Sequence, residues 1–232
     1  MLAPILLLGL LLPVRAQSDD REPADATPAE DAAGFHWNSA LTQSGIFLGG
    51  EHVIRMTQGK TRRELSGPFW SDYLESASSI HTWNDGDSIF TNYVGHPMMG
   101  AVTGYIQVLN DPHGRRLEFD LSSKRYWKSR LRAMAWSAAY SAQFELGPIG
   151  EASIGNVGKH PPTMAVVDLV VTPIGGFTLM VLEDYLDKRF VSRWEHVGGM
   201  KARFYRFALN PSRSLANMLR WKYPSYRDNR PL

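Results

Sequence analysis

The chain has 232 residues, of which 44% are hydrophobic and 21% are charged. This composition indicates a globular protein of ordinary domain size and excludes a wholly disordered chain. The formal net charge of +2 points to no polyanionic partner, and the absence of cysteine excludes disulfides, thiolate metal sites and a cysteine nucleophile.

The charges are unevenly distributed. Residues 17–187 hold thirteen basic and twenty-one acidic side chains, a net charge of −8, whereas residues 188–232 hold eleven basic and two acidic ones, a net charge of +9. We therefore expect an acidic main body followed by a basic C-terminal segment.

Residues 1–16 have the pattern of a secretory signal peptide. The apolar run Leu2–Pro13 has about the length of a signal h-region, and Val14 and Ala16 place small residues at positions −3 and −1 of a cleavage site. The run is well short of the roughly 20 residues that span a bilayer; a short buried helix or anchor is the alternative. We predict an exported protein of a Gram-negative-type envelope, in the periplasm or associated with a membrane.

Composition divides the remaining chain into three parts. Residues 17–34 hold six acidic side chains and no aromatic one, so residues 17–36 are predicted to be a disordered acidic spacer. Residues 37–210 are predicted to form a helical domain. Residues 211–232 are predicted to be a basic aromatic tail that packs on that domain or on a membrane surface.

Helical spacing of apolar residues predicts most of the secondary structure. We expect helices over Ser39–Met56, from Pro68 to near Ser79, over the uncharged stretch Ser88–Asn110, from a cap at Ser122–Ser123 to Gly147–Pro148, and over Ser214–Trp221. The apolar run Thr163–Leu182 is interrupted near Pro173, which predicts two half-helices or one kinked helix.

No segment carries a convincing hairpin signal, so the predicted fold is all-α. We expect a compact bundle of about five to seven helices with Gly/Ala helix contacts and one helix broken by Pro and Gly. An integral membrane bundle is an alternative because Ser88–Asn110 is uncharged, but Asn92, His96 and Gln107 make burial in protein the favoured interpretation.

A stripe of residues spaced four apart is the most specific local pattern. Its members share one helical face: Asn92, His96, Gly100 and Gly104. Pro97 cannot donate a hydrogen bond to the carbonyl of Tyr93, which predicts a distorted turn at His96. A satisfied core histidine is the alternative to a functional one.

Asp168 is the second candidate, because a carboxylate in an apolar helix must be paired or protonated if it is buried. Its partner would be His96 or His52, and a His–Asp pair can serve acid–base catalysis. The candidate catalytic residues are therefore His96, Asp168 and Asn92, with a structural tie between helices as the alternative.

Other polar positions are weaker candidates. Asp85 and Asp87 resemble the start of a calcium loop, but Ile89 and Phe90 stand where that loop needs a ligand and a glycine, so helix capping is favoured. The predicted ligand-binding residues are His52, Asp85, Asp87, Gly100 and Glu183. We predict no metal site and no cofactor, and the common hydrolase, NTPase and dinucleotide motifs are absent from the sequence.

The C-terminal segment interleaves basic and aromatic residues. Its predicted contacts with a membrane or another anionic surface are Arg203, Arg206, Arg220, Trp221 and Lys222. Nucleic acid is disfavoured as a partner of an exported protein, so envelope lipid or another envelope protein is expected. The alternative is packing onto the acidic part of the same chain. The oligomeric state is not predicted.

Several motifs together resemble a bacterial cell-envelope family that is defined as a domain of unknown function. They are Trp83-x-Asp85-Gly86-Asp87, Asn92-Tyr93-Val94-Gly95-His96-Pro97-Met98-x-Gly100, Asp168-Leu169-x-Val171-Thr172-Pro173-x-Gly175-Gly176 and Asn210-Pro211-x-Arg213-Ser214, with His52-x-x-Arg55 and Gly67-Pro68-Phe69 upstream. The resemblance covers about residues 38–228. It implies an exported protein and leaves the activity open.

Two main functional hypotheses follow. The first is a non-enzymatic helical bundle that binds lipid or protein at a membrane surface. The second is an enzyme that acts on envelope lipid or glycan through a buried His–carboxylate pair.

Overall fold

The computed structural model of the protein describes residues 34–57, 59–64, 67–78, 83, 87–153, 166–228 and 230. Within these ranges it is the predicted all-α bundle, and none of these residues lies in a strand. The predicted signal peptide, the predicted spacer up to residue 33 and the ligand candidate Asp85 lie outside the described residues.

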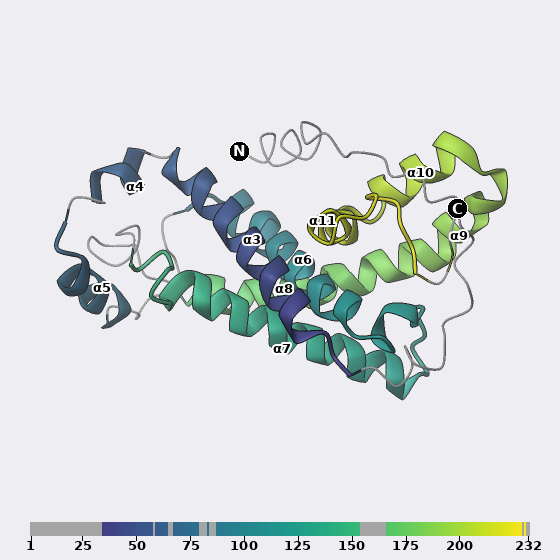
Figure 1. Ribbon diagram of the computed structural model, residues 1–232, viewed down its shortest axis with the longest axis horizontal. Helices are drawn as coiled ribbons and strands as arrows, with labels where there is room; N and C mark the ends of the chain where they lie inside the picture. The colour runs from purple at the N-terminus through teal and green to yellow at the C-terminus, as the bar shows by residue number, and fades with distance from the viewer. Residues whose placement is uncertain are drawn as a thin grey trace.

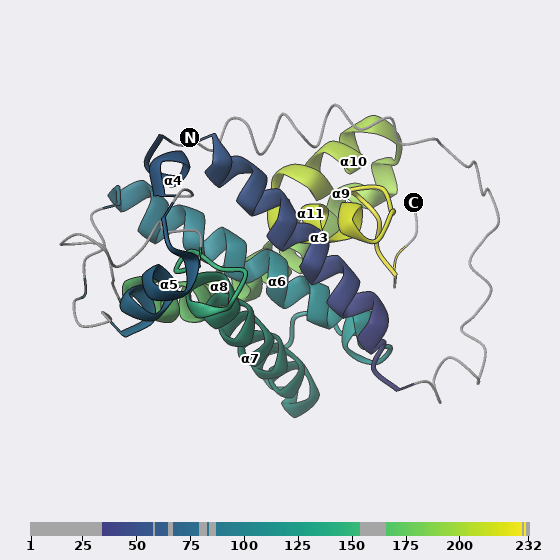
Figure 2. The ribbon, with the colours of Figure 1, turned by 60° about the vertical axis from the view of Figure 1, so that its left-hand side comes forward.

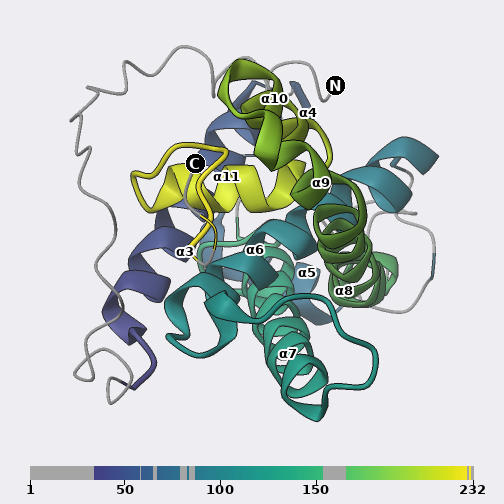
Figure 3. The ribbon, with the colours of Figure 1, turned by 90° about the vertical axis from the view of Figure 1, so that its right-hand side faces the viewer.

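Four long helices form the body of the bundle (Figure 1). They are α3 (Trp37–Met56), α6 (His96–Asn110), α7 (Lys124–Leu146) and α8 (Val167–Leu186). The central helix is α6, which packs against α3, α7, α8 and α11 (Pro211–Leu219), as Figure 3 shows. Thirteen of its residues are buried, which explains why its sequence lacks charge.

Side-chain contacts give the directions of the helices. The start of α6 meets the start of α8 at His96 and Asp168, and Tyr105 further along α6 reaches Asp184 near the end of α8. These two helices are therefore parallel. Since Arg130 near the start of α7 also reaches Asp184, α7 is antiparallel to both.

Shorter helices lie at the two ends of the molecule (Figures 1 and 2). At one end are α4 (Gly59–Glu64) and α5 (Phe69–Ser78), and at the other are α9 (Ser192–Trp194) and α10 (Gly199–Ala208). Single turns of other helix types are η1 (Thr91–Gly95), η2 (Gly114–Arg116), η3 (Asp187–Val191) and η4 (Glu195–Val197). The first helix of the predicted tail, α11, packs on α6 and α3.

Capping residues set the ends of α7 as the sequence predicts. The Ser123 hydroxyl accepts a hydrogen bond from the backbone N–H of Tyr126 at 3.2 Å, which satisfies one of the free donors at the helix start. The helix ends at Leu146, directly before Gly147.

Glycines bring α6 and α8 into close contact. A Cβ atom on Gly100 would overlap the backbone carbonyl of Thr172, and one on Gly176 would lie 2.6 Å from the backbone nitrogen of Ala101. The predicted small-residue contact is therefore present. The run around Pro173 forms one continuous helix, α8, with the proline inside it, so the predicted break into two half-helices is wrong.

The predicted distortion at His96 is also present. The five residues before it form the π-helical turn η1. Pro97 has no N–H to donate to the carbonyl of Tyr93, so regular α-helical bonding is interrupted at this point. Such π-helical turns often occur at functional sites.

Candidate functional site

His96 and Asp168, the two principal site candidates, are in contact. Nε2 of His96 lies 3.2 Å from Oδ1 of Asp168, and Nδ1 of His96 lies 3.1 Å from the hydroxyl oxygen of Thr172. Thr172 follows Asp168 by one helical turn, so both side chains project from the same face of α8. All three residues are buried, and the two partners hold the imidazole ring in one orientation.

Glu145 completes a group of three. One ligand atom from each of His96, Glu145 and Asp168 lies within 4.8 Å of the other two, and all three residues are buried. The central helices α6, α7 and α8 thus each contribute one side chain at the same end of the bundle. Sequence reasoning did not place Glu145 in the site, because no sequence spacing relates α7 to the other two helices.

Arg55 from α3 lies beside this group. Its Nε atom is 2.7 Å from Oε1 of Glu151, and its Nη1 atom is 3.8 Å from Oδ2 of Asp87. Burial acts against the charge of the guanidinium, but the carboxylates of Glu151, Asp87, Glu145 and Asp168 raise the pKa of Arg55 above its ordinary value. The electrostatic potential in this region therefore favours positive charge.

A second carboxylic acid lies one turn before Arg55 on α3. The Tyr140 hydroxyl and Oε2 of Glu51 are 2.6 Å apart. Burial raises the pKa of Glu51 to about 8, aided by the negative charge of Glu151 and opposed by the Tyr140 hydrogen bond and by Arg55. Glu51 is therefore mostly protonated at neutral pH.

The four buried residues His96, Glu145, Asp168 and Glu151, together with the half-buried Arg55, will be called the carboxylate–histidine centre. Asp87 contacts it through Arg55, and Gly100 lies against the backbone of Thr172.

His52 lies at the edge of the centre. Its Nε2 atom donates a hydrogen bond to the carbonyl oxygen of Ile149 at 2.7 Å, and its ring stacks on Phe144 at a centroid distance of 5.5 Å. Of the two imidazoles considered as the partner of Asp168, the structure therefore places His96 there. Asn92 is buried on η1, one turn before His96.

Glu183 lies outside the centre, at the opposite end of α8. Its carboxylate accepts hydrogen bonds from the backbone N–H groups of Ser212 and Arg213. Burial raises its pKa to about 7 against these hydrogen bonds. Glu183 caps the start of α11 and does not share a site with His96.

The neighbouring Asp184 forms a second buried network. Its carboxylate accepts four hydrogen bonds, from Arg130 at 2.6 Å, Arg213 at 2.8 Å, and the hydroxyls of Tyr105 and Tyr126 at 3.0 Å. Burial alone would raise its pKa, but Arg130 and Arg213 lower it below its ordinary value. Every lone pair is used, so this network ties α6, α7, α8 and α11 together.

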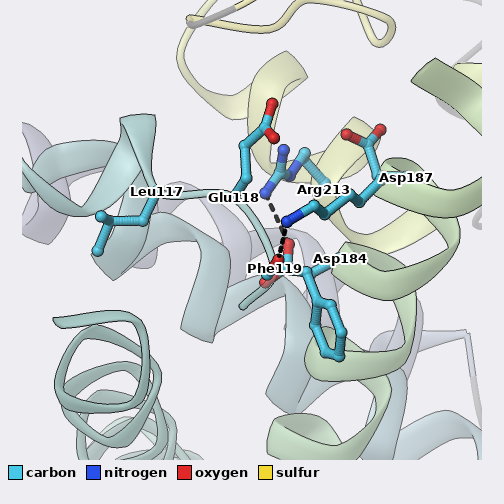
Figure 4. Close-up of a pocket in the computed structure, with 7 residues that line it drawn as sticks. Leu117, Glu118, Phe119, Asp184, Asp187 and Arg213 are labelled. Atoms are coloured by element: carbon cyan, nitrogen blue, oxygen red, sulfur yellow. Dashed lines mark hydrogen bonds and ion pairs between the residues drawn. The ribbon is translucent and has the colours of Figure 1, made fainter. Parts of the chain in front are cut away.

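A small cavity adjoins this network, shown in Figure 4. It has room for about one water molecule, ≈ 10 Å³, between the segment Leu117–Phe119 and the side chains of Asp184, Asp187 and Arg213. It is too small for an organic ligand.

The predicted membrane-contact residues of the tail divide into two groups. Arg206 is buried and donates to Glu195 at 2.8 Å, and Arg220 forms an ion pair with Asp228 at 2.7 Å. The other three, Arg203, Trp221 and Lys222, are exposed. Part of the basic charge of the tail therefore serves the chain itself.

Comparison of the chain with protein-family models, curated proteins and solved structures finds no match. The resemblance to a bacterial envelope family stays a prediction.

Proposed function

We propose that the protein binds a divalent transition-metal cation at His96, Glu145 and Asp168, and that this centre is its functional site. The observation that carries the proposal is the convergence of three buried ligand atoms, from three helices, within 4.8 Å. Neighbouring ligands of an ion with bonds of about 2.0–2.2 Å lie about 3–4 Å apart, so small side-chain rotations would bring the three atoms to one ion.

The donor set favours particular ions. One imidazole and two carboxylates suit Mn²⁺, Fe²⁺ or Zn²⁺, whereas Ca²⁺ and Mg²⁺ prefer oxygen ligands alone. The hydroxyl of Thr172 at Nδ1 of His96 is the kind of outer partner that orients a metal-binding imidazole. The raised pKa of Arg55 also supports the proposal, because it reports a potential that favours cations.

The contact between His96 and Asp168 predicts competition between protons and metal. A neutral imidazole with its proton on Nδ1 would turn a lone pair toward the carboxylate, which is unfavourable unless a positive charge lies between them. Either a proton on Nε2 or a metal ion places positive charge between the imidazole and the carboxylate. The affinity for the metal should therefore rise with pH, because metal binding displaces protons from its ligands.

The number of protein ligands also indicates the kind of metal site. Three protein ligands leave coordination positions for water or substrate, which is typical of catalytic rather than structural metal sites. We therefore extend the proposal to hydrolysis of an envelope lipid or glycan. The His96–Asp168 contact equally supports metal-free acid–base catalysis as a second candidate.

Calorimetric titration with Mn²⁺ and Zn²⁺ tests the proposal on the purified full chain after treatment with a chelator. We expect one equivalent to bind, and Glu145→Gln and Asp168→Asn to weaken binding at least tenfold. Glu183→Gln is the matched control, because it removes a buried acid from the other end of α8 and should leave the affinity within about twofold of the wild type.

The metal proposal fails if the wild-type chain binds neither ion between pH 7 and 8, or if Glu183→Gln weakens binding as much as Asp168→Asn does. If the wild-type chain binds no metal but an activity is lost in Asp168→Asn, the acid–base candidate takes its place.

A further inference from the structure

The polar side of α8 faces the protein and its apolar side faces outward. The buried side holds all three acidic residues of the helix, Asp168, Glu183 and Asp184, together with Thr172, Gly176 and the apolar Val167, Pro173 and Met180. The exposed stripe holds Ile174, Thr178, Leu182 and Tyr185. An amphipathic helix on the surface of a soluble protein has the opposite arrangement. The outer side of α8 is therefore suited to an apolar environment.

The two hydroxyl groups of the exposed stripe are compatible with a lipid environment. Thr178 donates its hydroxyl hydrogen to the carbonyl oxygen of Ile174 at 2.9 Å, within the helix. The tyrosine at position 185 is the type of side chain found where a bilayer meets water. Thr178 can therefore lie against lipid with its hydroxyl satisfied, and the Tyr185 hydroxyl would lie at the level of the headgroups.

The adjoining face of α7 continues this surface. Its C-terminal half has exposed alanines at Ala135, Ala138, Ala139 and Ala142, and no charged residue between positions 133 and 144. Among the described residues of the whole chain, more polar or charged residues are buried than hydrophobic ones. The inverted polarity is thus a property of the bundle and is not limited to one helix.

The helix that contains α8 is also long enough to cross the hydrocarbon core of a bilayer. The continuous helical stretch Val167–Trp194 has 28 residues and contains an 18-residue segment with a mean hydropathy of 1.4 and at most two charged residues. About 20 residues of helix span the hydrocarbon core of a bilayer. Only a third of that segment is buried inside the protein.

Basic side chains gather at one end of this apolar surface. Exposed Lys188, Arg189 and Arg193 follow the apolar part of α8, and exposed Lys124, Arg125 and Lys128 begin the antiparallel α7 at the same end. Nζ of Lys188 donates to the backbone carbonyl of Phe119, just before α7, at 2.7 Å. An apolar band that ends in basic side chains is complementary to acyl chains that end in anionic headgroups.

We propose that the outer face of α8 and the adjoining face of α7 contact the acyl chains of a lipid bilayer, and that the six basic side chains at their shared end contact lipid phosphates. This inference does not depend on metal binding. A second copy of the chain is the other occupant to consider. In a symmetric dimer with the two α8 helices parallel, however, the six basic side chains of one copy would lie against the same six of the other and would repel them.

Site-specific labelling tests the first part, because the chain has no cysteine to remove. A fluorophore on Ile174→Cys or Leu182→Cys, in full chain mixed with vesicles of 70% neutral and 30% anionic lipid, should be quenched by doxyl-labelled lipid and shielded from iodide. The control Ala208→Cys, on an exposed alanine of α10, should show the reverse.

Charge reversal tests the second part. Changing Lys188, Arg189 and Arg193 together to Glu should weaken partitioning onto the anionic vesicles at least tenfold at low salt. The matched variant changes Lys201, Arg203 and Lys222, three exposed basic residues of α10 and the tail, to Glu. It should weaken partitioning less than threefold.

Three results would overturn the proposal. Iodide could quench the labels on α8 as strongly as the label on Ala208→Cys in the presence of vesicles. The α10 and tail variant could lose more partitioning than the α8 variant, which would assign the contact to the tail. In the third result, the labels on α8 are shielded from iodide equally well without lipid, and Leu182→Cys chains form disulfide-linked pairs. This result would assign the face to a second copy.

Discussion

Nε2 of His96 lies 3.2 Å from Oδ1 of Asp168, where the start of the central helix α6 lies against the start of α8. The contact depends on an irregular helix start at Pro97 and on glycines that let the two backbones approach closely.

Gly100 should not tolerate a larger residue. In Gly100→Ala the new Cβ would overlap the backbone carbonyl of Thr172, which cannot move without shifting α8. We expect the free energy of unfolding to fall by about 1–3 kcal/mol or more, measured by urea denaturation. Gly45→Ala is the control: this helical glycine of α3 has nothing near its Cβ position, so the change should be neutral or stabilising by up to about 1 kcal/mol. Equal changes in the free energy of unfolding for Gly100→Ala and Gly45→Ala would contradict the close packing of α6 against α8.

Stability should fall as pH rises from about 4.5 to 8 through Glu51. The folded-state pKa of Glu51 is raised from 4.5 to about 8 by burial, so the folded protein holds a proton in this range that the unfolded chain has released. The stabilisation is present at low pH and is lost as pH rises through the folded-state pKa. Replacing Glu51 with Gln should reduce the slope of the unfolding free energy against pH by up to about 1.4 kcal/mol per pH unit.

Urea denaturation at pH 5, 6.5 and 8 measures the effect of Glu51→Gln. The exposed Glu75 of α5 is the control position, and Glu75→Gln should keep the wild-type slope. A Glu51→Gln protein with that same slope would mean that Glu51 is ionised in the folded state.

Asp184 should be essential for stability. Asp184→Asn leaves the guanidinium groups of Arg130 and Arg213 without their buried anion, and removing one partner of such a network costs about 3–5 kcal/mol. Tyr126→Phe removes only one hydrogen bond from the same carboxylate and should cost about 1 kcal/mol. Asp184→Asn costing no more than Tyr126→Phe would show that the network is not what ties the helices together.

Arg55 should compete with a bound cation. Arg55→Gln removes a positive charge that interacts with Glu145 and Asp168, so the cation-free protein should melt at a lower temperature while Mn²⁺ raises its Tm by more than it raises that of the wild type. The exposed Arg132→Gln on α7 should leave both values near those of the wild type. If Mn²⁺ raises the Tm of Arg55→Gln by less than it raises that of the wild type, the ion binds outside the carboxylate–histidine centre.

Much of the fold was predictable from local signals. The cap at Ser123 and the uncharged stretch of α6 fix element positions by chemistry that acts within a few residues. The pairing of His96 with Asp168 was also predictable as one of two options, because a buried carboxylate in an apolar helix requires a partner.

Other parts of the site depend on tertiary packing. Glu145 and Arg55 join the centre only because α7 runs antiparallel to α8 and α3 lies beside them, and no spacing in the sequence encodes these directions. Glu183 has the same local appearance as Asp168, a buried acid on α8, yet it caps α11 at the other end. Likewise, the basic charge of Arg206 is neutralised by Glu195, which composition alone does not reveal.

The most direct test of the proposed centre is pulsed electron paramagnetic resonance of the full chain loaded with one equivalent of Mn²⁺. Binding at His96, Glu145 and Asp168 predicts nitrogen modulation from one imidazole, lost in His96→Gln and retained in His52→Gln, since the ring of His52 is directed to the carbonyl of Ile149. Modulation that persists in His96→Gln, or that is absent from the wild-type spectrum, would contradict the proposed centre.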